Sequence, residues 1–181
     1  IPLQSGCDTI LREMGRRYDT AAFARKIEYI RQKSEVPGGP KVFFGIDVIV
    51  GFPGETKEDF QDTIDLVNEL KYDLAYTFIY SPREGTPASI MPDDTSLEEK
   101  KMRLATLNEL VNKYALLNNQ KYLNSIVDVL IEGKSDKEDK LMGYTDTMKL
   151  VNIEADPKYI GEIVNVEIID VKTWSLEGVI R

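Results

Sequence analysis

The spacing of apolar residues predicts alternating helices and strands up to about residue 118. Asp8 is placed to cap a helix that runs through Met14. The glycine- and proline-rich stretch Val36–Pro40 ends a second helix, which begins at Thr20. The apolar face of this second helix carries Phe23, Ile27 and Ile30.

Two apolar runs in this region are rich in β-branched and aromatic residues. The first, Lys41–Val50, has the composition of a parallel strand that is covered on both faces. The second, Leu74–Tyr80, is predicted to be another buried strand of the same sheet.

A helix is predicted after each of these strands. Thr56 and Asp59 have the spacing of a capping box, so a helix is expected from Lys57. Its inner face would carry Phe60, Ile64 and Val67. A longer, charged helix is expected from Ser96 to about Asn118. The order strand, helix, strand, helix is typical of an α/β fold built from βαβ units.

From residue 119 onward the pattern changes to short alternating runs separated by Gly, Asp, Asn and Pro. Such runs predict a small antiparallel barrel or sandwich. We therefore expect two domains, residues 1–118 with an α/β fold and residues 119–181 with an all-β fold. No apolar run approaches the roughly 20 residues that a membrane span requires.

Composition excludes several kinds of site. The chain has 181 residues, a single cysteine, Cys7, and no histidine. A zinc site of cysteines and histidines, a Ser-His-Asp triad and a Cys-His dyad are therefore impossible within it. We expect no side chain here to act as a general acid or base, and no metal ligand set. The net charge is −8, so any RNA binding would depend on local patches of positive charge.

The stretch "GIDVIVGFPGET", Gly45–Thr56, is the most informative for function. Side chains alternate along a strand, so Gly45, Asp47, Ile49 and Gly51 share one face. Ligands of parallel α/β sheets bind beyond the carboxyl ends of the strands, which is where the turn at Gly51 lies. Two glycines and an aspartate on one face favour a ligand-facing strand, and a merely tight turn is the alternative. The Gly-Lys-Ser/Thr ending of a P-loop is missing.

Polar side chains also occur at other predicted element ends. Gln4 and Ser5 follow a strand end and would face the same rim, unless Ser5 only caps the next helix. Arg17 follows a helix end, where it is either solvated beside the helix dipole or binds a carboxylate or phosphate. Cys7 is either a reactive thiol or an inert small residue.

Five motifs occur in order along the chain: "PLQSG", "MGRRY", "DVIVGFPGET", "YTFIYSPREGTPAS" and "LMGYTDTMKLVN". With them the sequence resembles the tRNA methylthiotransferases of the MiaB type, which are radical S-adenosylmethionine (SAM) enzymes. The string "YTFIYSPREGTPA" favours this branch over the ribosomal-protein methylthiotransferases. The resemblance implies that residues 1–118 form the C-terminal half of a radical-SAM (β/α) partial barrel. It also implies that residues 119–181 form a TRAM domain, a small OB-like barrel associated with RNA binding.

The resemblance further implies an activity and its cofactors. The parent enzyme would methylthiolate C2 of N6-isopentenyladenosine beside the anticodon, with SAM and two [4Fe–4S] clusters as cofactors. The cysteines that hold both clusters in the family are absent from this sequence. The chain is therefore expected to be a fragment that is inactive alone. Its partners would be the tRNA anticodon stem-loop and the missing N-terminal part of the same protein, in the cytoplasm and without a membrane.

Residue roles follow from the resemblance by motif. SAM would contact Gln4, Ser5, Arg17, Asp47, Ile49, Gly51 and Tyr80. RNA would contact Arg83, Lys121, Lys149 and Trp174. Packing on the barrel is the alternative for Trp174, and a rigid surface connection is the alternative for the loop Ser81–Ser89 that holds Arg83. Two other functions stay open: a non-catalytic RNA-binding module, and a methylthiotransferase that acts on a ribosomal protein or on threonylcarbamoyladenosine.

Overall fold

The computed structural model describes residues 1–39, 41–136 and 139–181. The chain divides into two units, which are described separately. The first unit comprises residues 1–40 and 44–112, and the second comprises residues 41–43 and 113–181. Among the described residues, no helix has both the length and the apolar character needed to cross a membrane.

The first unit is built on a three-stranded parallel sheet. Its strands are β1 (Pro2–Gln4), β2 (Gly45–Val50) and β3 (Leu74–Ile79), in the order β1-β2-β3. β2 and β3 are joined by the helix α3 (Lys57–Leu70) and lie parallel, which confirms the predicted βαβ unit. Their register pairs Asp47 with Tyr76 and Ile49 with Phe78, so these four side chains share one face of the sheet.

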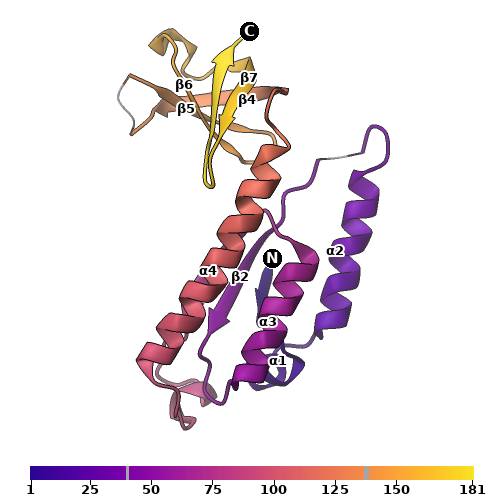
Figure 1. Cartoon of the computed structure of the whole chain (residues 1–181), viewed down its shortest axis with the longest axis vertical. Coiled ribbons are helices and arrows are strands. Elements are labelled where there is room, and N and C mark those ends of the chain that lie inside the picture. The colour runs from indigo at the N-terminus through magenta and orange to yellow at the C-terminus, as the bar shows by residue number, and fades with distance from the viewer. Residues whose placement is uncertain (40, 137–138) are drawn as a thin grey trace. The chain divides into compact units, whose positions relative to one another are not determined.

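The longer helices of this unit begin at residues with capping side chains. The elements are α1 (Asp8–Glu13), α2 (Thr20–Ser34), α3, a short 3₁₀ helix η1 (Pro87–Ile90) and α4 (Leu97–Gln120), of which residues through Asn112 belong to this unit. The capping box of Thr56 and Asp59 is present at the start of α3. Ser96 accepts a hydrogen bond from the Glu99 amide at the start of α4. α3 and α4 lie on the same side of the sheet (Figure 1).

Two of the predicted element limits are wrong. Asp8 is the first residue of α1 rather than its cap, and its carboxylate instead accepts a hydrogen bond from the Thr20 amide at the start of α2. The predicted strand Lys41–Val50 begins only at Gly45. Phe44 is held outside the strand, because its amide donates to the Asp73 carboxylate and its carbonyl accepts from the Leu74 amide.

The covered face of the sheet forms the core of the first unit. The alternation predicted for β2 is confirmed, since Ile46, Val48 and Val50 are at most 1% exposed. The prediction that β3 is a buried strand is wrong, because only Ala75 is buried while Tyr76 is 57% and Phe78 51% exposed. The inner face of α3 also differs from the prediction, since its buried residues are Thr63, Leu66, Val67 and Leu70.

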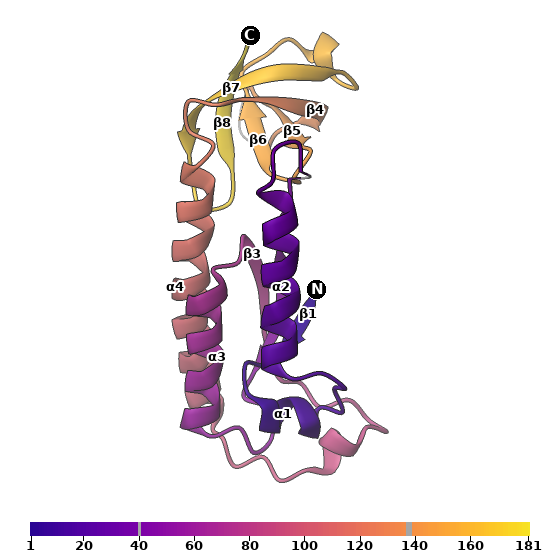
Figure 2. The same cartoon turned by 90° about the vertical axis from the view of Figure 1, so that its right-hand side faces the viewer.

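The second unit is a closed five-stranded barrel (Figure 2). Its strands are β4 (Ile126–Lys134), β5 (Leu141–Thr145), β6 (Leu150–Ile153), β7 (Ile163–Val171) and β8 (Leu176–Ile180), with a 3₁₀ turn η2 (Pro157–Tyr159) before β7. They close in the order β4-β5-β6-β8-β7, and every neighbouring pair is antiparallel except β6 and β8. This confirms the predicted small barrel.

Strand alternation fills the barrel with aliphatic side chains. The buried core consists of Val127, Val129, Ile131, Leu141, Val151, Ile153, Val166, Ile168 and Leu176. Gly143 of β5 lies against the backbone of Leu130, where an added Cβ would clash. A glycine at this position therefore lets two strands approach closely where the barrel bends.

Candidate ligand and RNA sites

The turn after β2 is held by a buried carboxylate. Gly51 has φ +68°, and its amide donates to Glu55 Oε2 at 2.6 Å. The Glu55 amide in turn donates to the Phe52 carbonyl at 2.9 Å. Gly54, at φ +83°, completes the bend. The turn therefore has a fixed shape at the carboxyl end of the central strand, where α/β sheets bind ligands.

Arg103 of α4 locks this turn in place. Its Nη1 donates to the Glu55 carbonyl at 2.9 Å and to Glu55 Oε2 at 2.8 Å, and its Nε donates to Glu99 Oε1 at 3.1 Å. The side chains of Arg103 and Glu55 are 5% and 1% exposed. The sequence analysis missed both residues, and the only available signal was a glutamate directly after the Pro-Gly turn.

Burial is the largest single influence on the pKa of each partner in this pair. Desolvation raises the pKa of Glu55, and the hydrogen bonds from Arg103 and the Gly51 amide offset this only in part. For Arg103, burial lowers the pKa, but hydrogen bonds to Glu55 and Glu99 outweigh burial and raise it. Removal of the arginine would leave a buried carboxylate without a counter-charge, so the pair is a single structural unit.

Lys100 and Tyr80 flank the same turn. Lys100 forms an ion pair with Asp93, and a Cβ added at Gly51 would lie 2.5 Å from Lys100 Cγ. The Tyr80 ring packs edge-on against Phe52 with a centroid distance of 5.1 Å, and the Lys100 ammonium lies 6.0 Å from the Tyr80 centroid. The Tyr80 hydroxyl is buried and has no hydrogen-bond partner in the described part of the chain.

The predicted ligand face of β2 is open. Gly45, Asp47 and Ile49 are half-buried, next to the exposed rings of Tyr76 and Phe78. The structure thus brings Asp47 and Ile49 together with two aromatic residues that the sequence analysis did not assign to a site. Alternation along Leu74–Tyr80 could have identified both, had β3 been recognised as covered on one face only.

The other predicted rim residues lie at the end of β1 and after α1. Gln4 is at φ +71°, and its Oε1 accepts a hydrogen bond from Arg16 Nη2 at 2.8 Å. Ser5 is fully buried, and its hydroxyl accepts from the Cys7 amide and lies 3.5 Å from Thr63 Oγ1 of α3. Arg17 is exposed. Positive φ at a residue other than glycine is strained and occurs often at functional sites, which keeps Gln4 of interest.

The Cys7 thiol is buried beside the capping box of α3. Its Sγ donates to Asp59 Oδ1 at 2.9 Å. Burial, and next the hydrogen bond to Asp59, raise the pKa of the thiol. Potential ligand atoms of Cys7, Asp59 and Asp62 lie within 4.8 Å of one another. Asp59 Oδ2, however, already accepts hydrogen bonds from the amide and hydroxyl of Thr56. The arrangement of these residues is therefore explained by the cap of α3.

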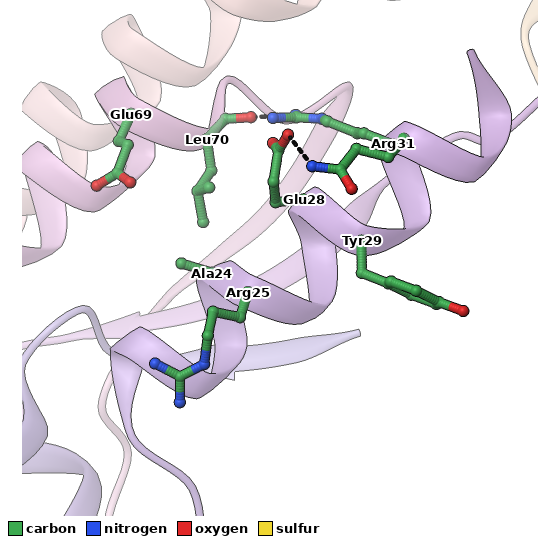
Figure 3. Close-up of a pocket in the computed structure, with 8 residues that line it drawn as sticks. Ala24, Arg25, Glu28, Tyr29, Arg31, Glu69 and Leu70 are labelled. Atoms are coloured by element: carbon green, nitrogen blue, oxygen red, sulfur yellow. Dashed lines mark hydrogen bonds between the residues drawn. The ribbon is translucent and has the colours of Figure 1, made fainter. Parts of the chain in front are cut away.

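A cleft between α2 and α3 is lined by residues outside every predicted site (Figure 3). Arg31 donates to the Leu70 carbonyl at the end of α3, and Glu28 accepts from Gln32 at 3.2 Å. Tyr29 extends away from Leu70. The bond from Arg31 joins α2 to the end of α3, whereas the bond between Gln32 and Glu28 lies within α2, so the cleft is explained by helix packing.

Arg83 lies exposed in the loop after β3. The loop is shaped by its own bonds, since the Arg83 carbonyl accepts from the amide and the hydroxyl of Thr86 at 3.2 and 2.7 Å. Gly85 has φ +81°. Within the described residues the Arg83 guanidinium has no hydrogen bond or ion pair. The side chain is therefore accessible to an anionic partner.

The predicted RNA residues of the second unit differ in exposure. Lys121 is exposed and donates to Asn118 at 2.8 Å, and Trp174 is 54% exposed. Lys149 is only 7% exposed, with its ammonium 4.6 Å from the Phe43 centroid. Two other lysines, Lys140 and Lys172, both form ion pairs with Glu177.

Comparison with known proteins defines the class of the second unit. Residues 120–180 match the family model of the TRAM domain. The match coincides with the closed barrel β4–β8, so the second unit carries a TRAM domain.

Nearly the whole chain is similar to named enzymes. It is 46% identical over 179 residues to a tRNA-2-methylthio-N(6)-dimethylallyladenosine synthase of Bacillus cytotoxicus, an alignment that covers 98% of this chain and 34% of the relative. Identity is also 46% over 180 residues with the enzyme of the same name from Oceanobacillus iheyensis, covering 99% of this chain and 34% of the relative. These matches confirm the resemblance to the MiaB-type tRNA methylthiotransferases. The chain spans about a third of the length of these curated relatives.

Proposed function

We propose that this chain is the C-terminal part of a tRNA-2-methylthio-N(6)-dimethylallyladenosine synthase, which methylthiolates C2 of N6-isopentenyladenosine beside the anticodon. The observation that carries the proposal is 46% identity to enzymes of this name over 98% of the chain. The five motifs in family order agree with it.

Residues 1–118 are proposed to be the later half of a radical-SAM partial barrel, followed by the TRAM domain from residue 119. A parallel sheet with crossover helices on one face and an opposite face that those helices leave open supports this assignment. The opposite face would be the interior of the barrel.

The residues present fit one side of a SAM site. Tyr80 offers a buried hydroxyl without a described partner, and the Gly51 turn leaves no room for a side chain. Gln4, Ser5, Arg17, Asp47, Ile49, Gly51 and Tyr80 are proposed as the positions around SAM. SAM would supply the methyl group and, with a cluster, the radical that starts the reaction. The chain itself would bind and orient SAM, with Glu55 and Arg103 fixing the turn at Gly51.

The residues present do not fit an iron–sulfur cluster. Cys7 is the only cysteine, and its thiol is buried against Asp59. The ligands of two [4Fe–4S] clusters would therefore come from the N-terminal part of the same protein. We infer that this chain alone does not catalyse the methylthiolation reaction.

The proposed RNA partner is a tRNA anticodon stem-loop in the cytoplasm. The TRAM domain and the exposed side chains of Arg83, Lys121 and Trp174 support this assignment. The side chain of Lys149 is buried, so its proposed role is to support the shape of the barrel that contacts RNA.

The test is mass spectrometry of tRNA nucleosides after reaction of the complete protein with reconstituted clusters. The expected product is the 2-methylthio derivative of N6-isopentenyladenosine. A product on threonylcarbamoyladenosine or on a ribosomal protein would overturn the proposal. The 181-residue chain treated in parallel should cleave no SAM. Arg83→Ala in the complete protein should weaken tRNA use and leave SAM cleavage largely intact.

A further inference from the structure

One buried side chain joins the end of α4 to the turn between β7 and β8. Asn119 is 2% exposed, and its Nδ2 donates to the Lys172 carbonyl at 2.8 Å and to the Thr173 carbonyl at 3.1 Å. All three residues belong to the second unit, and Figure 2 shows the hairpin beside the last turns of α4. Because the two carbonyls are consecutive, one amide group fixes the backbone of the turn at two successive peptide groups.

This turn lacks the hydrogen bond that ordinarily closes a tight turn. It comprises Lys172–Ser175, between the last paired residues of β7 and β8. In such a turn the carbonyl of the first residue usually accepts from the amide of the fourth. Among the described residues no such bond runs from Ser175 to Lys172, and the Lys172 carbonyl accepts from Asn119. The shape of the turn therefore depends on a side chain from another element.

The same turn carries Trp174, the only tryptophan of the chain, which is 54% exposed. Among the described residues it belongs neither to the barrel core nor to the apolar residues packed against that core, so packing on the barrel does not explain it. The exposed Lys121 follows Asn119 by two positions. The hydrogen bonds of Asn119 thus lie within two residues of both Trp174 and Lys121, two of the residues proposed to contact RNA.

We propose that Asn119 is a positioning residue for RNA binding, which holds the Trp174 indole in the orientation that stacks on an unpaired base of the tRNA. This inference rests on the proposed function. An aromatic side chain that is already held in its bound orientation loses less conformational entropy when it stacks on a base. Lys121 would contact the phosphate backbone beside that base. Asn119 itself is buried and acts through the turn.

The surroundings of Asn119 allow its positioning role to be separated from a role in folding. Its Oδ1 is buried without a hydrogen-bond partner in the described part of the chain. Leucine has a similar shape and no polar atom, so Asn119→Leu removes the two hydrogen bonds and the unsatisfied oxygen together. The released carbonyls belong to the exposed Lys172 and the half-buried Thr173, where water can bind them. The barrel should therefore stay folded with little change in stability.

The test follows the fluorescence of Trp174 while the 181-residue chain is titrated with a tRNA anticodon stem-loop. In the wild-type chain, stacking on a base should quench the fluorescence. Asn119→Leu should weaken binding about fivefold and reduce the quenching, because the indole is no longer held in place. It should also lower the fluorescence anisotropy of Trp174 in the free chain. Gln120→Ala, which changes an exposed neighbour on α4, should alter none of these quantities.

A double-mutant cycle shows whether Asn119 acts through Trp174. With a fluorescently labelled stem-loop, Trp174→Ala should weaken binding about tenfold. Adding Asn119→Leu to Trp174→Ala should weaken binding little further, because the residue that Asn119 positions is already absent. A further loss as large as that of Asn119→Leu alone would contradict the positioning role.

The possible results separate this inference from the proposed function. Unchanged binding and anisotropy in Asn119→Leu would refute the positioning role and leave the tRNA assignment standing. Weaker binding with an unchanged anisotropy of Trp174 would also refute it, since the turn would then be held without Asn119. Failure of the wild-type chain to bind the stem-loop would contradict both. If circular dichroism shows that Asn119→Leu is unfolded, Asn119→Ser, which offers a single donor, replaces it in the same measurements.

Discussion

The two units of this chain differ in whether their β-sheet is closed or open. In the second unit five strands close into a barrel, so the sheet has no free edge and encloses a core whose described residues are aliphatic. In the first unit three parallel strands are covered on one face, while the other exposes Tyr76 and Phe78. A closed sheet satisfies its own hydrogen bonds and core, whereas an open sheet face is available for a ligand.

The two units also differ in what fixes their geometry. The barrel is stabilised by apolar packing distributed over all its strands. The turn after β2 in the first unit instead depends on the buried ion pair of Glu55 and Arg103. A single substitution should therefore damage the turn more than most single substitutions damage the barrel.

The largest effect is expected from Arg103→Ala. It leaves the Glu55 carboxylate buried without a counter-charge and should destabilise the first unit by about 3–5 kcal/mol. Urea unfolding followed by the helix signal in circular dichroism should show this loss. The fluorescence of Trp174, the only tryptophan and located in the second unit, should keep its midpoint. The exposed Arg83→Ala is the matched control, and an equal loss there would contradict the assignment.

Ile131→Ala tests the barrel in the same way. The side chain is fully buried, and its truncation should cost the second unit about 2–5 kcal/mol through lost transfer energy and a residual cavity. The urea midpoint of Trp174 fluorescence measures the loss. Ile126 lies on the same strand but is 62% exposed, so Ile126→Ala should change stability by less than about 0.5 kcal/mol. Similar losses in both variants would show that the barrel core is not where the structure places it.

Gly51→Ala and Gly54→Ala separate crowding from backbone strain in the turn. Both glycines have positive φ, so each substitution should cost roughly 1–2 kcal/mol of strain. A Cβ at Gly51 would also meet the methylenes of Lys100, whereas nothing lies within 4 Å of one at Gly54. Gly51→Ala should therefore be clearly the more destabilising in urea unfolding of the first unit. Equal losses of stability would mean that the Lys100 side chain moves aside at little energetic cost.

The sequence predicted those features that depend on near neighbours in the chain. The capping box of Thr56 and Asp59 spans three positions, and strand alternation placed Asp47 and Ile49 on the half-buried face. The ion pair of Glu55 and Arg103 joins residues 48 positions apart, so no local pattern reveals it. The exposure of Tyr76 was missed for a similar reason, since an apolar run does not show which of its faces another element covers.

The smallest effect concerns Cys7 and tests how tightly the first unit closes around α1. Alkylation requires the thiolate, and burial together with the Asp59 hydrogen bond raises the pKa of this thiol. The alkylation rate of the folded chain should therefore rise only at a higher pH than that of the urea-unfolded chain. Asp59→Asn removes the neighbouring negative charge and should shift the profile back toward lower pH. Asp62→Asn, close by but without a hydrogen bond to the thiol, should leave it nearly unchanged. If the pH profile of alkylation were the same in the folded and the unfolded chain, α1 would open readily. The covered face of the first unit would then be weakly packed, in addition to the other face being open.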